Sequence, residues 1–510
     1  MSFASFHNPI VARTYREGVH GWFAVASVLT AVTIALGCGG DTDLSACILP
    51  PPTDRLEVRQ LTYVKASVGA GTESAFGAGV SLSADGSTLA VGAPYDPSGA
   101  LGVNADPTDR SRTDAGAAHV FVRSGVTWVQ EAYLKPANAH AAVEFGRLVS
   151  LSKTGDTLIV GVPQDSDPKF SGSAVVFRRV GGRWTEEGYL RSSLGGSGGQ
   201  FGVSVALSDE GDTAVVGALH SAGHGTAGCE FATGAKDLCR GAAYVFERTN
   251  GRWEERAILR PPEWMSLPYP VLDALLMGTV VRVSGDGNVV AALATGTLLT
   301  FTRGPKWMFE ASTALPAPRH DPDPLIGFGP RGGYSITPMS LAISSDGSTL
   351  AVGEPEPPAR GETFASRVEV FARRDGNLSK TATVQPLASR PDAKFGWRVA
   401  LSGAGERLAV GAYADSGGQG GTNPNPCAST VEGAGAAYLF ALEGATWKER
   451  AFLKARRVNQ AANFGRSVAL DALGATLVVG APGDPSNASG IDGDESDTST
   501  PYAGATYVFR

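Results

Sequence analysis

The sequence predicts an all-β chain built from seven copies of one short unit, and three observations support this prediction. A phrase recurs along the chain in the order F-G, V-x-L-S, V-G-A and G-A-x-x-V-F. In five copies the Gly of F-G and the Gly of V-G-A lie 15 residues apart. The composition, with 66 Gly, 31 Pro and 43% hydrophobic residues, is typical of short strands joined by turns. Repetition of this kind indicates an array of similar structural units.

Each copy is expected to form four antiparallel strands. The V-x-L-S and T-L-A-V runs alternate apolar and other residues at the period of a strand, and a tight turn such as 84–86 joins them into a hairpin. G-A-x-x-V-F supplies a third strand, as at 116–121. In most copies a Trp follows the Phe of that strand by seven residues and opens a fourth strand, as Trp128 does. A repeat is therefore a four-stranded meander.

Five copies are well kept and two are eroded. The well-kept copies start at Phe76, Phe145, Phe201, Phe395 and Phe464. One eroded copy runs from Met277 to Trp307, and the other keeps the run from Ile343 to Gly353, followed by Phe371. The predicted units span about 75–135, 144–190, 200–260, 276–312, 336–385, 394–454 and 463–510, the last together with 56–66.

Isolated sheets of this size would leave both faces and edges exposed, whereas radial stacking around an axis covers both faces of each sheet. The seven copies therefore predict a seven-bladed β-propeller of four-stranded antiparallel blades over residues 56–510. The last copy stops at Arg510 without a fourth strand, and the segment from Gln60 to Lys65 resembles the segment from Glu131 to Lys135. We expect the N-terminal strand to complete the last blade and close the ring.

The F-G, V-G-A-P and G-A-x-x-V-F elements resemble the FG-GAP repeats of integrin-α-type propellers over about 450 residues. In that family a calcium loop, D-x-D-x-D-G, precedes the second strand. Here the corresponding turns read SADGST, SKTGDT, SDEGDT and SGAGER, which have too few carboxylates for the six or more oxygen ligands of Ca²⁺. The integrin calcium sites are therefore not expected in these turns. The chain is more similar to a short-turn bacterial variety of the repeat, whose members are mostly exported.

Residues 1–37 have the plan of a signal peptide. Arg13 and Arg16 precede an apolar run over 22–37 that is shorter than the roughly 18 apolar residues of a membrane span. The end of the run, from Ala35 to Cys38, resembles a bacterial lipoprotein box, which implies that Cys38 is lipidated and becomes the new N-terminus. Residues 38–55 then form a lipidated tether. An ordinary secretory signal and an uncleaved anchor are the alternatives, and all three predict export.

Four more cysteines follow, an even number in a compartment that permits disulfides. Cys229 and Cys239 lie in one loop and are the candidate disulfide. Cys47 and Cys427 are the two cysteines left over, and nothing else indicates that they pair, so their connectivity stays open. A metal site is a poor alternative, because no second close pair or His cluster completes a tetrahedral set.

Long loops between the second and third strands are the expected binding surface. The interval from the V-G-A Gly to the G-A-x-x-V-F Gly is 24 residues in four copies. Loops without a structural constraint would be expected to differ in length. In a closed ring the first, sixth and seventh blades are neighbours, so three of these loops share one sector. The loops of blades one and seven also align, with the pairs Asp96 and Asp484, Asn104 and Asp492, Asp106 and Asp494, and Asp109 and Asp497.

The aligned side chains have two interpretations. Oxygen ligands at such spacings could bind Ca²⁺, the only cofactor considered for this chain. The alternative is that Asp and Asn, together with Gly and Pro, serve turn geometry. Two histidines in another long loop, His220 and His224, are expected to be solvated. His119 stands at a strand position that holds Tyr in other copies, so we expect it to be a packing substitution.

These features favour an exported, lipid-anchored surface protein that acts as a binding or adhesion module for a protein or glycan. The domain would be a monomer at a bacterial membrane, facing the periplasm or the cell surface. The formal charge of −7, or −8 without residues 1–37, gives no drive toward nucleic acid. The sequence shows no metalloprotease motif, and we expect no catalytic residues and no enzyme.

Two alternatives remain at this point. One is a propeller-type hydrolase or lyase acting on an extracellular polymer, and the other is a structural scaffold of the envelope. Charged side chains converging on the central channel would favour the enzyme. A channel plugged by small apolar residues, together with a broad loop face, would favour the binding module.

Overall fold

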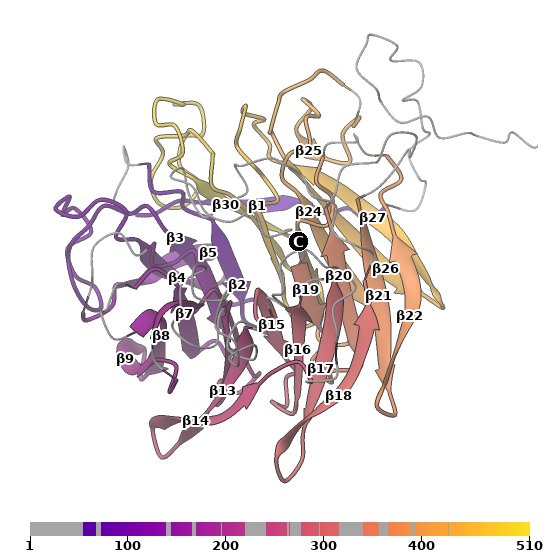
Figure 1. Ribbon diagram of the computed structural model, residues 1–510. Coiled ribbons are helices and arrows are strands. Elements are labelled where there is room, and N and C mark those ends of the chain that lie inside the picture. Colours follow the sequence, from indigo (N-terminus) through magenta and orange to yellow (C-terminus); the bar gives the residue numbers. More distant parts are fainter. Residues whose placement is uncertain are drawn as a thin grey trace, which may run out of the picture. The chain divides into compact units, whose positions relative to one another are not determined.

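Figure 1 shows the computed structural model of the chain. It describes residues 55–67, 73–138, 144–165, 170–194, 196–219, 241–262, 265, 277–294, 296–315, 340–355, 366–388, 393–426 and 428–510. These residues form strands, turns and loops. In this part of the chain no helix is long and apolar enough to cross a bilayer.

The strands form seven antiparallel blades. Blade one holds β2 (Gly79–Leu82), β3 (Thr88–Ala93), β4 (Ala117–Ser124) and β5 (Thr127–Leu134). Blade two holds β6 (Leu148–Leu151), β7 (Thr157–Val162), β8 (Phe170–Val180) and β9 (Arg183–Leu190). Blade three holds β11 (Ser204–Leu207), β12 (Thr213–Ala218), β13 (Ala242–Thr249) and β14 (Arg252–Leu259). Blade four holds β15 (Val280–Val283), β16 (Val289–Ala294), β17 (Thr297–Arg303) and β18 (Trp307–Ala314).

The other three blades follow the same plan. Blade five holds β19 (Ser340–Ile343), β20 (Thr349–Glu354), β21 (Arg367–Arg374) and β22 (Asn377–Val384). Blade six holds β23 (Arg398–Leu401), β24 (Arg407–Ala412), β26 (Ala436–Glu443) and β27 (Thr446–Lys454). Blade seven holds β28 (Ser467–Leu470), β29 (Leu477–Ala481), β30 (Ala505–Phe509) and β1 (Gln60–Val64). Two short strands are additional: β10 (Gly196–Phe201) runs parallel to β8, and β25 (Gly421–Thr422) pairs with β27.

The first strands of the blades surround a common axis. Each contacts the first strand of the next blade, in the order β2, β6, β11, β15, β19, β23, β28 and again β2. The apolar core is divided accordingly into seven clusters, one between each pair of neighbouring blades. The cluster between blades seven and one joins Val91 and Phe121 to Val478 and Val508. The seven-bladed propeller predicted from the repeat is therefore confirmed.

The repeated glycines are explained by close contacts between blades. Between blades one and two, Gly116 has a φ of +75° and Gly146 a φ of +95°, a region that side-chain-bearing residues rarely adopt. A Cβ on Gly116 would lie 2.1 Å from the carbonyl oxygen of Phe145, and one on Gly92 would lie 1.6 Å from that of Gly146. The glycines of all three motif elements therefore meet at one blade boundary, where only glycine fits.

The turns between the first and second strands are tied into a ring of backbone hydrogen bonds. The amide of one turn donates to a carbonyl of the next around all seven blades. The donor and acceptor pairs are Ala84 to Lys153, Thr154 to Asp209, Asp209 to Gly285, Gly285 to Ser345, Ser345 to Gly403, Gly403 to Ala472 and Ala472 to Ala84, with N···O distances of 2.7–3.2 Å. This belt holds the turn end of the ring together and fixes the inner strands around the axis.

Blade seven contains strands from both ends of the described chain. β1 pairs antiparallel with β30, with Tyr63 opposite Tyr507 and Val64 opposite Thr506. The strand order of the sheet is β1, β30, β29, β28, so β1 takes the outer place that the fourth strand has elsewhere. Tyr63 and Val64 are at most 1% exposed, and burial of two such side chains contributes about 3–6 kcal/mol to the stability of this blade.

Candidate functional site

Two features of the ring can hold a ligand: the long loops on one face and a cavity on the axis. We define the loop platform as residues 94–116, 413–435 and 482–504, which join the second and third strands of blades one, six and seven. The loops of blades six and seven rise on the same side of their sheets (Figure 1). Arg456, which follows β27 of blade six, forms an ion pair of 2.7 Å with Glu495 in the loop of blade seven. This ion pair links the end of blade six to the loop of blade seven.

A buried lysine and aspartate anchor the loop of blade one. The Asp96 carboxylate accepts hydrogen bonds from the Tyr133 hydroxyl at 2.8 Å and from the Ser98 amide at 3.0 Å. The Nζ of Lys135 lies 3.6 Å from Asp96 and donates to the carbonyl oxygens of Ser98 and Gly116. Lys135 is fully buried, and burial lowers the pKa of its ammonium although Asp96 acts in the opposite direction.

The loop of blade seven repeats this anchor with residues from the N-terminal segment. Asp484 accepts hydrogen bonds from the hydroxyls of Tyr63 and Tyr507, each at 3.0 Å. The Nζ of Lys65 lies 3.6 Å from Asp484 and donates to the carbonyl of Ser486. Burial, assisted by the Asp484 carboxylate, raises the pKa of both tyrosines, which keep their protons. The residues that pairing of the N-terminal strand brings here, Tyr63 and Lys65, are therefore the same residues that hold this loop in place.

A second contact pins the middle of each loop to its outer strand. Asn104 donates its amide to the carbonyl of Tyr133 at 2.7 Å and accepts the Tyr133 amide on its side chain at 2.9 Å. Asp492 makes the same two contacts with Tyr63, each at 2.8 Å. Both residues have φ values above +50°, which Asn and Asp tolerate better than other side chains. The residue-by-residue alignment of these two loops therefore reflects equal geometry.

Blade six carries the same anchor, which the sequence comparison missed. Asp415 accepts a hydrogen bond of 2.7 Å from the buried Lys454, and Asn423 makes the paired contacts with Phe452 at 2.6 and 2.9 Å. The signal was present, since Asp415 and Asn423 are separated by the same eight residues as Asp96 and Asn104. The three loops of the platform thus share one construction.

The four remaining acidic candidates lie at exposed turns. Each carboxylate accepts hydrogen bonds from the residue two positions further along the chain. Asp106, Asp109 and Asp494 accept from both the backbone amide and the hydroxyl of Thr108, Ser111 and Ser496. Asp497 accepts from the backbone amide of Ser499. Side-chain hydrogen bonds lower the pKa of all four carboxyls. Among the described residues, no three His, Cys, Asp or Glu side chains form a group able to hold a metal ion. Calcium binding stays a prediction, and turn geometry alone accounts for these contacts.

Several predicted features lie outside the described residues. They are the leader, Cys38 and most of the tether, the candidate disulfide of Cys229 and Cys239, the cysteines 47 and 427, and the loop with His220 and His224. His119 is described and is 1% exposed. Its ring packs against Phe76 and Tyr133 with centroid distances of 5.2 Å, and neither ring nitrogen has a hydrogen-bond partner. It occupies the place of Tyr507 in blade seven, as expected of a packing substitution.

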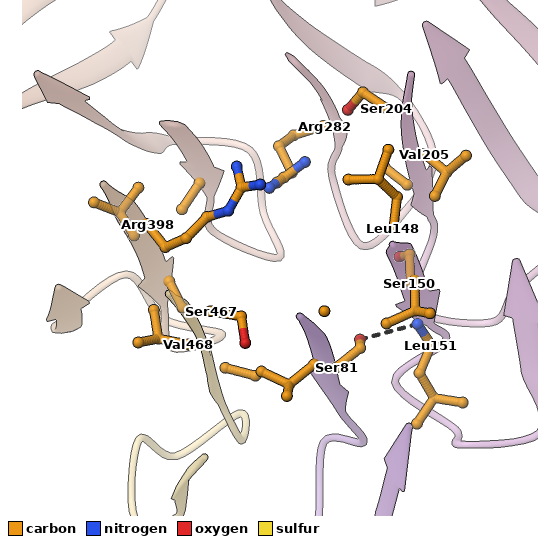
Figure 2. A pocket seen from close by; sticks show the side chains of 18 of the residues that line it. Ser81, Leu148, Ser150, Leu151, Ser204, Val205, Arg282, Arg398, Ser467 and Val468 are labelled. Carbon is orange, nitrogen blue, oxygen red and sulfur yellow. Dashed lines mark hydrogen bonds between the residues drawn. The ribbon is translucent and has the colours of Figure 1, made fainter. Parts of the chain in front are cut away.

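The axis of the ring encloses a cavity of about 370 Å³. The first strands of all seven blades line it, from the residues after F-G at one end to the turns at the other. Four arginines converge on it, Arg147, Arg282, Arg398 and Arg466. Figure 2 shows Arg282 of blade four and Arg398 of blade six pointing toward one another inside the cavity. The repeat pattern of the sequence does not predict these arginines.

The four arginines differ in their partners. Arg147 forms an ion pair of 2.7 Å with Glu144, whereas no described carboxylate lies within 4.0 Å of the guanidinium groups of the other three. Burial lowers the pKa of Arg282 to about 10. Burial, followed by the positive charges of Arg282 and Arg147, lowers the pKa of Arg398 to about 10. Both side chains therefore keep their charge at neutral pH and repel one another.

At the other end of the cavity, near the turns, lie Lys153 and Asp209. Burial lowers the pKa of Lys153, against the attraction of Asp209 and Asp471. Asp209 is the only carboxylate among the described residues that line the cavity. The lining is thus cationic although the whole chain has a formal charge of −7.

Comparison with known proteins gives a family match and several similar structures. Residues 128–177 and 184–246 match the FG-GAP repeat. No curated protein sequence matches the chain. A periplasmic gluconolactonase of Pseudomonas aeruginosa is 16% identical with a TM-score of 0.39, over 71% of this chain and 87% of that one. A proposed 6-phosphogluconolactonase of Bacteroides fragilis is 13% identical with a TM-score of 0.42, over 81% and 99%.

A third similar structure is a protein from Lactobacillus plantarum, 12% identical with a TM-score of 0.41, over 77% of this chain and 88% of that one. These neighbours correct one expectation. The prediction that the chain is not an enzyme does not stand, because lactonases are among the similar structures. At such identities the likeness concerns the fold and assigns no activity to this chain.

The first matched segment runs from β5 of blade one into blade two, and the second runs from β9 of blade two into blade three. Each repeat that the sequence defines forms one blade. Its characteristic glycines lie where neighbouring blades touch, and its phenylalanines lie in the core between blades. The chain therefore folds as a seven-bladed β-propeller that contains FG-GAP repeats.

Proposed function

We propose that this protein is an exported, lipid-anchored binding module that attaches a protein or glycan partner to the loop platform. The observation that carries the proposal is the shared Lys–Asp anchor beneath the three loops, with Lys135, Lys65 and Lys454 all nearly fully buried. Loops held in one conformation lose little entropy on binding, so rigid loops favour affinity. The anchors support rigidity, and the loop tips remain exposed for contact.

Two apolar side chains on the platform are available to a partner. Leu101 in the loop of blade one is 49% exposed, and Tyr502 in the loop of blade seven is 51% exposed. The two loops belong to adjacent blades, and the carbonyl of Tyr502 accepts a hydrogen bond from Ala75 at the start of blade one. Exposed aromatic and aliphatic side chains on a polar, rigid surface are typical centres of protein and carbohydrate contacts.

One observation favours the alternative, a hydrolase or lyase acting on an extracellular polymer. Charged side chains converge on the axial cavity, which small apolar side chains do not fill. General acid–base chemistry needs an available carboxylate or histidine near the basic groups. Among the described lining residues only Asp209 qualifies, and it lies at the turn end. The binding module is therefore the first candidate, and the envelope scaffold has no observation of its own.

An array of glycans and extracellular matrix proteins tests the proposal. The purified protein is compared with Leu101→Ser/Tyr502→Asn, which alters the platform. The matched control is Val126→Ser/Leu473→Ser, in which two apolar side chains at β-turns outside the platform, 91% and 82% exposed, are removed. We expect a partner that binds the native protein and the control but loses at least tenfold in affinity for the platform variant. Equal binding by all three proteins would refute the platform as the site.

Attachment of the protein to a membrane through a lipid is tested separately. Export and lipidation of Cys38 are part of the proposal and rest on the sequence of residues 1–38. Labelling of cells with radioactive palmitate should mark the native protein and not Cys38→Ala. Label that persists in the variant would contradict lipidation at this residue while leaving the platform proposal intact.

A further inference from the structure

We propose that the axial cavity binds a small molecule carrying at least two anionic groups, either carboxylates or phosphate. This site is separate from the loop platform. The charged residues that line it are five cations, Arg147, Lys153, Arg282, Arg398 and Arg466, and one carboxylate, Asp209. In an acidic protein such a concentration of positive charge on a common axis needs a compensating charge.

The protein does not supply that charge for the central arginines. One nitrogen of Arg282 donates to the backbone oxygen of Val281 at 2.7 Å. The side chain of Arg398 has no hydrogen-bond or ion-pair partner among the described residues. Because a guanidinium carries five N–H donors in a planar fork, each group retains donors that face the cavity. The two forks point toward one another and can clamp an anion between them (Figure 2).

Arg466 is oriented for the same purpose by two aromatic rings. Its guanidinium carbon lies 4.1 Å from the ring centroid of Trp397 and 4.8 Å from that of Tyr413. Stacking on the rings fixes the plane of the guanidinium and leaves the N–H groups at its edge free to donate. Burial lowers the pKa of Arg466 to about 10, so the group remains a cation near neutral pH.

Three serines in the polar wall of the cavity can also donate to a ligand. The hydroxyls of Ser81, Ser150 and Ser204 accept the backbone amides of Leu151, Leu207 and Val281 on the following blades, at 2.9, 3.3 and 3.0 Å. Each hydroxyl therefore keeps its own proton to donate. A neutral sugar offers hydroxyl donors and would need acceptors in the wall, whereas carboxylate and phosphate oxygens only accept. The lining thus selects an anion.

The size of the cavity limits the ligand. A volume of about 370 Å³ lies at the lower end of the range of small-molecule sites, which is roughly 300–1,000 Å³. A single metabolite-sized anion fits this space. Arg147 and Arg466 directly precede β6 and β28, and Arg398 begins β23, so these three lie at the end of the strands near the loop face. The hydrogen-bonded turns lie at the opposite end. We therefore expect the ligand to enter from the loop face.

The experiment is a titration of the purified protein with inorganic phosphate, pyrophosphate and citrate at constant ionic strength, with glucose as the neutral control. Melting temperature and calorimetric heat are both recorded. We expect saturable stabilisation by at least one anion and none by glucose, since a ligand of the native state raises its stability. Loss of a charge-assisted hydrogen-bond pair in Arg282→Gln or Arg398→Gln should weaken Kd about 10- to 100-fold.

The control variant is Arg183→Gln, which removes an exposed arginine at the start of β9 and should leave Kd unchanged. Without ligand, the Arg282→Gln and Arg398→Gln proteins should melt at or above the temperature of the native protein, because one of two facing like charges is gone. Arg398→Lys keeps the charge and provides a folded protein if the Gln variants do not fold, and it should still weaken Kd. Absence of saturable stabilisation, or unchanged Kd in the arginine variants, would overturn the proposal.

Discussion

The buried imidazole of His119 should make this propeller sensitive to mild acid, and replacement by tyrosine should remove the sensitivity. Burial lowers the pKa of His119 from 6.5 to about 4, although the Asp96 carboxylate acts in the opposite direction. Above pH 6.5 the residue is neutral in both the folded and the unfolded chain. As the pH falls from 6.5 to 4 the unfolded chain binds a proton that the folded chain does not, so stability is lost in this window.

The magnitude follows from these two values. The folded protein loses roughly 1 kcal/mol at pH 5.5 and roughly 2–3 kcal/mol at pH 4.5 through this one group, relative to pH 8. In blade seven the equivalent Tyr507 donates its hydroxyl to Asp484 at 3.0 Å. A tyrosine at position 119 can donate to Asp96 in the same way. His119→Tyr should therefore also gain about 1.5–3 kcal/mol at neutral pH.

Urea unfolding of the native protein and His119→Tyr at pH 8.0, 5.5 and 4.5 provides the measurement. The difference between their free energies of unfolding should widen by roughly 2–3 kcal/mol between the first and last pH. The reciprocal control is Tyr438→His in blade six, where the ring packs on Phe395 as His119 packs on Phe76. That variant should acquire the same acid sensitivity. Parallel pH profiles for the native protein and His119→Tyr would refute the reasoning.

Four further predictions concern the anchor, the closure, the metal and the lipid. Lys135→Ala leaves the buried Asp96 without its cation and should cost about 3–5 kcal/mol in urea unfolding, whereas Lys380→Ala, at a half-exposed ion pair, should cost less than about 1 kcal/mol. Deletion of 56–66 removes β1 and should lower the melting temperature, and an unchanged value would contradict closure through this strand. Calcium should leave the melting temperature unshifted if the loop carboxylates serve only turns, and a saturable rise would identify a calcium site. Cys38→Ala should abolish palmitate labelling and release the protein from the membrane fraction.

The fold could be predicted from the sequence because the same physical constraint repeats in every blade. Glycine is required wherever neighbouring blades touch, so Gly92, Gly116 and Gly146 leave a fixed spacing in the sequence. The phenylalanines of F-G fill the interfaces and recur with it. The extra pairing of β10 with β8 has no such signal, because it depends on the path of a single linker.

The loop anchors were only partly predictable. The alignment of blades one and seven identified Asp96 and Asp484, but the lysines that hold them come from outer strands and lie 39 positions away in blade one. The pairing is visible only once the strands are folded back on the loops. Burial of these carboxylates explains why residues chosen as candidate calcium ligands have protein partners.

The axial arginines escaped prediction for a geometric reason. Arg147 and Arg466 follow the F-G glycine directly, whereas Arg398 is one residue later in its copy and Arg282 is three residues later. No single repeat position is therefore enriched in arginine. The four side chains come together only because the ring places the first strand of every blade around one axis.

Hydrogen exchange of the protein with and without an array partner tests the central claim most directly, because it locates the bound partner on the ring. The account predicts slower exchange of backbone amides in the loop platform, residues 94–116, 413–435 and 482–504, with the outer hairpin turns unchanged. Protection confined to the axial strands β15 (Val280–Val283) and β23 (Arg398–Leu401), with none in the platform, would contradict it and move the principal function to the axial cavity.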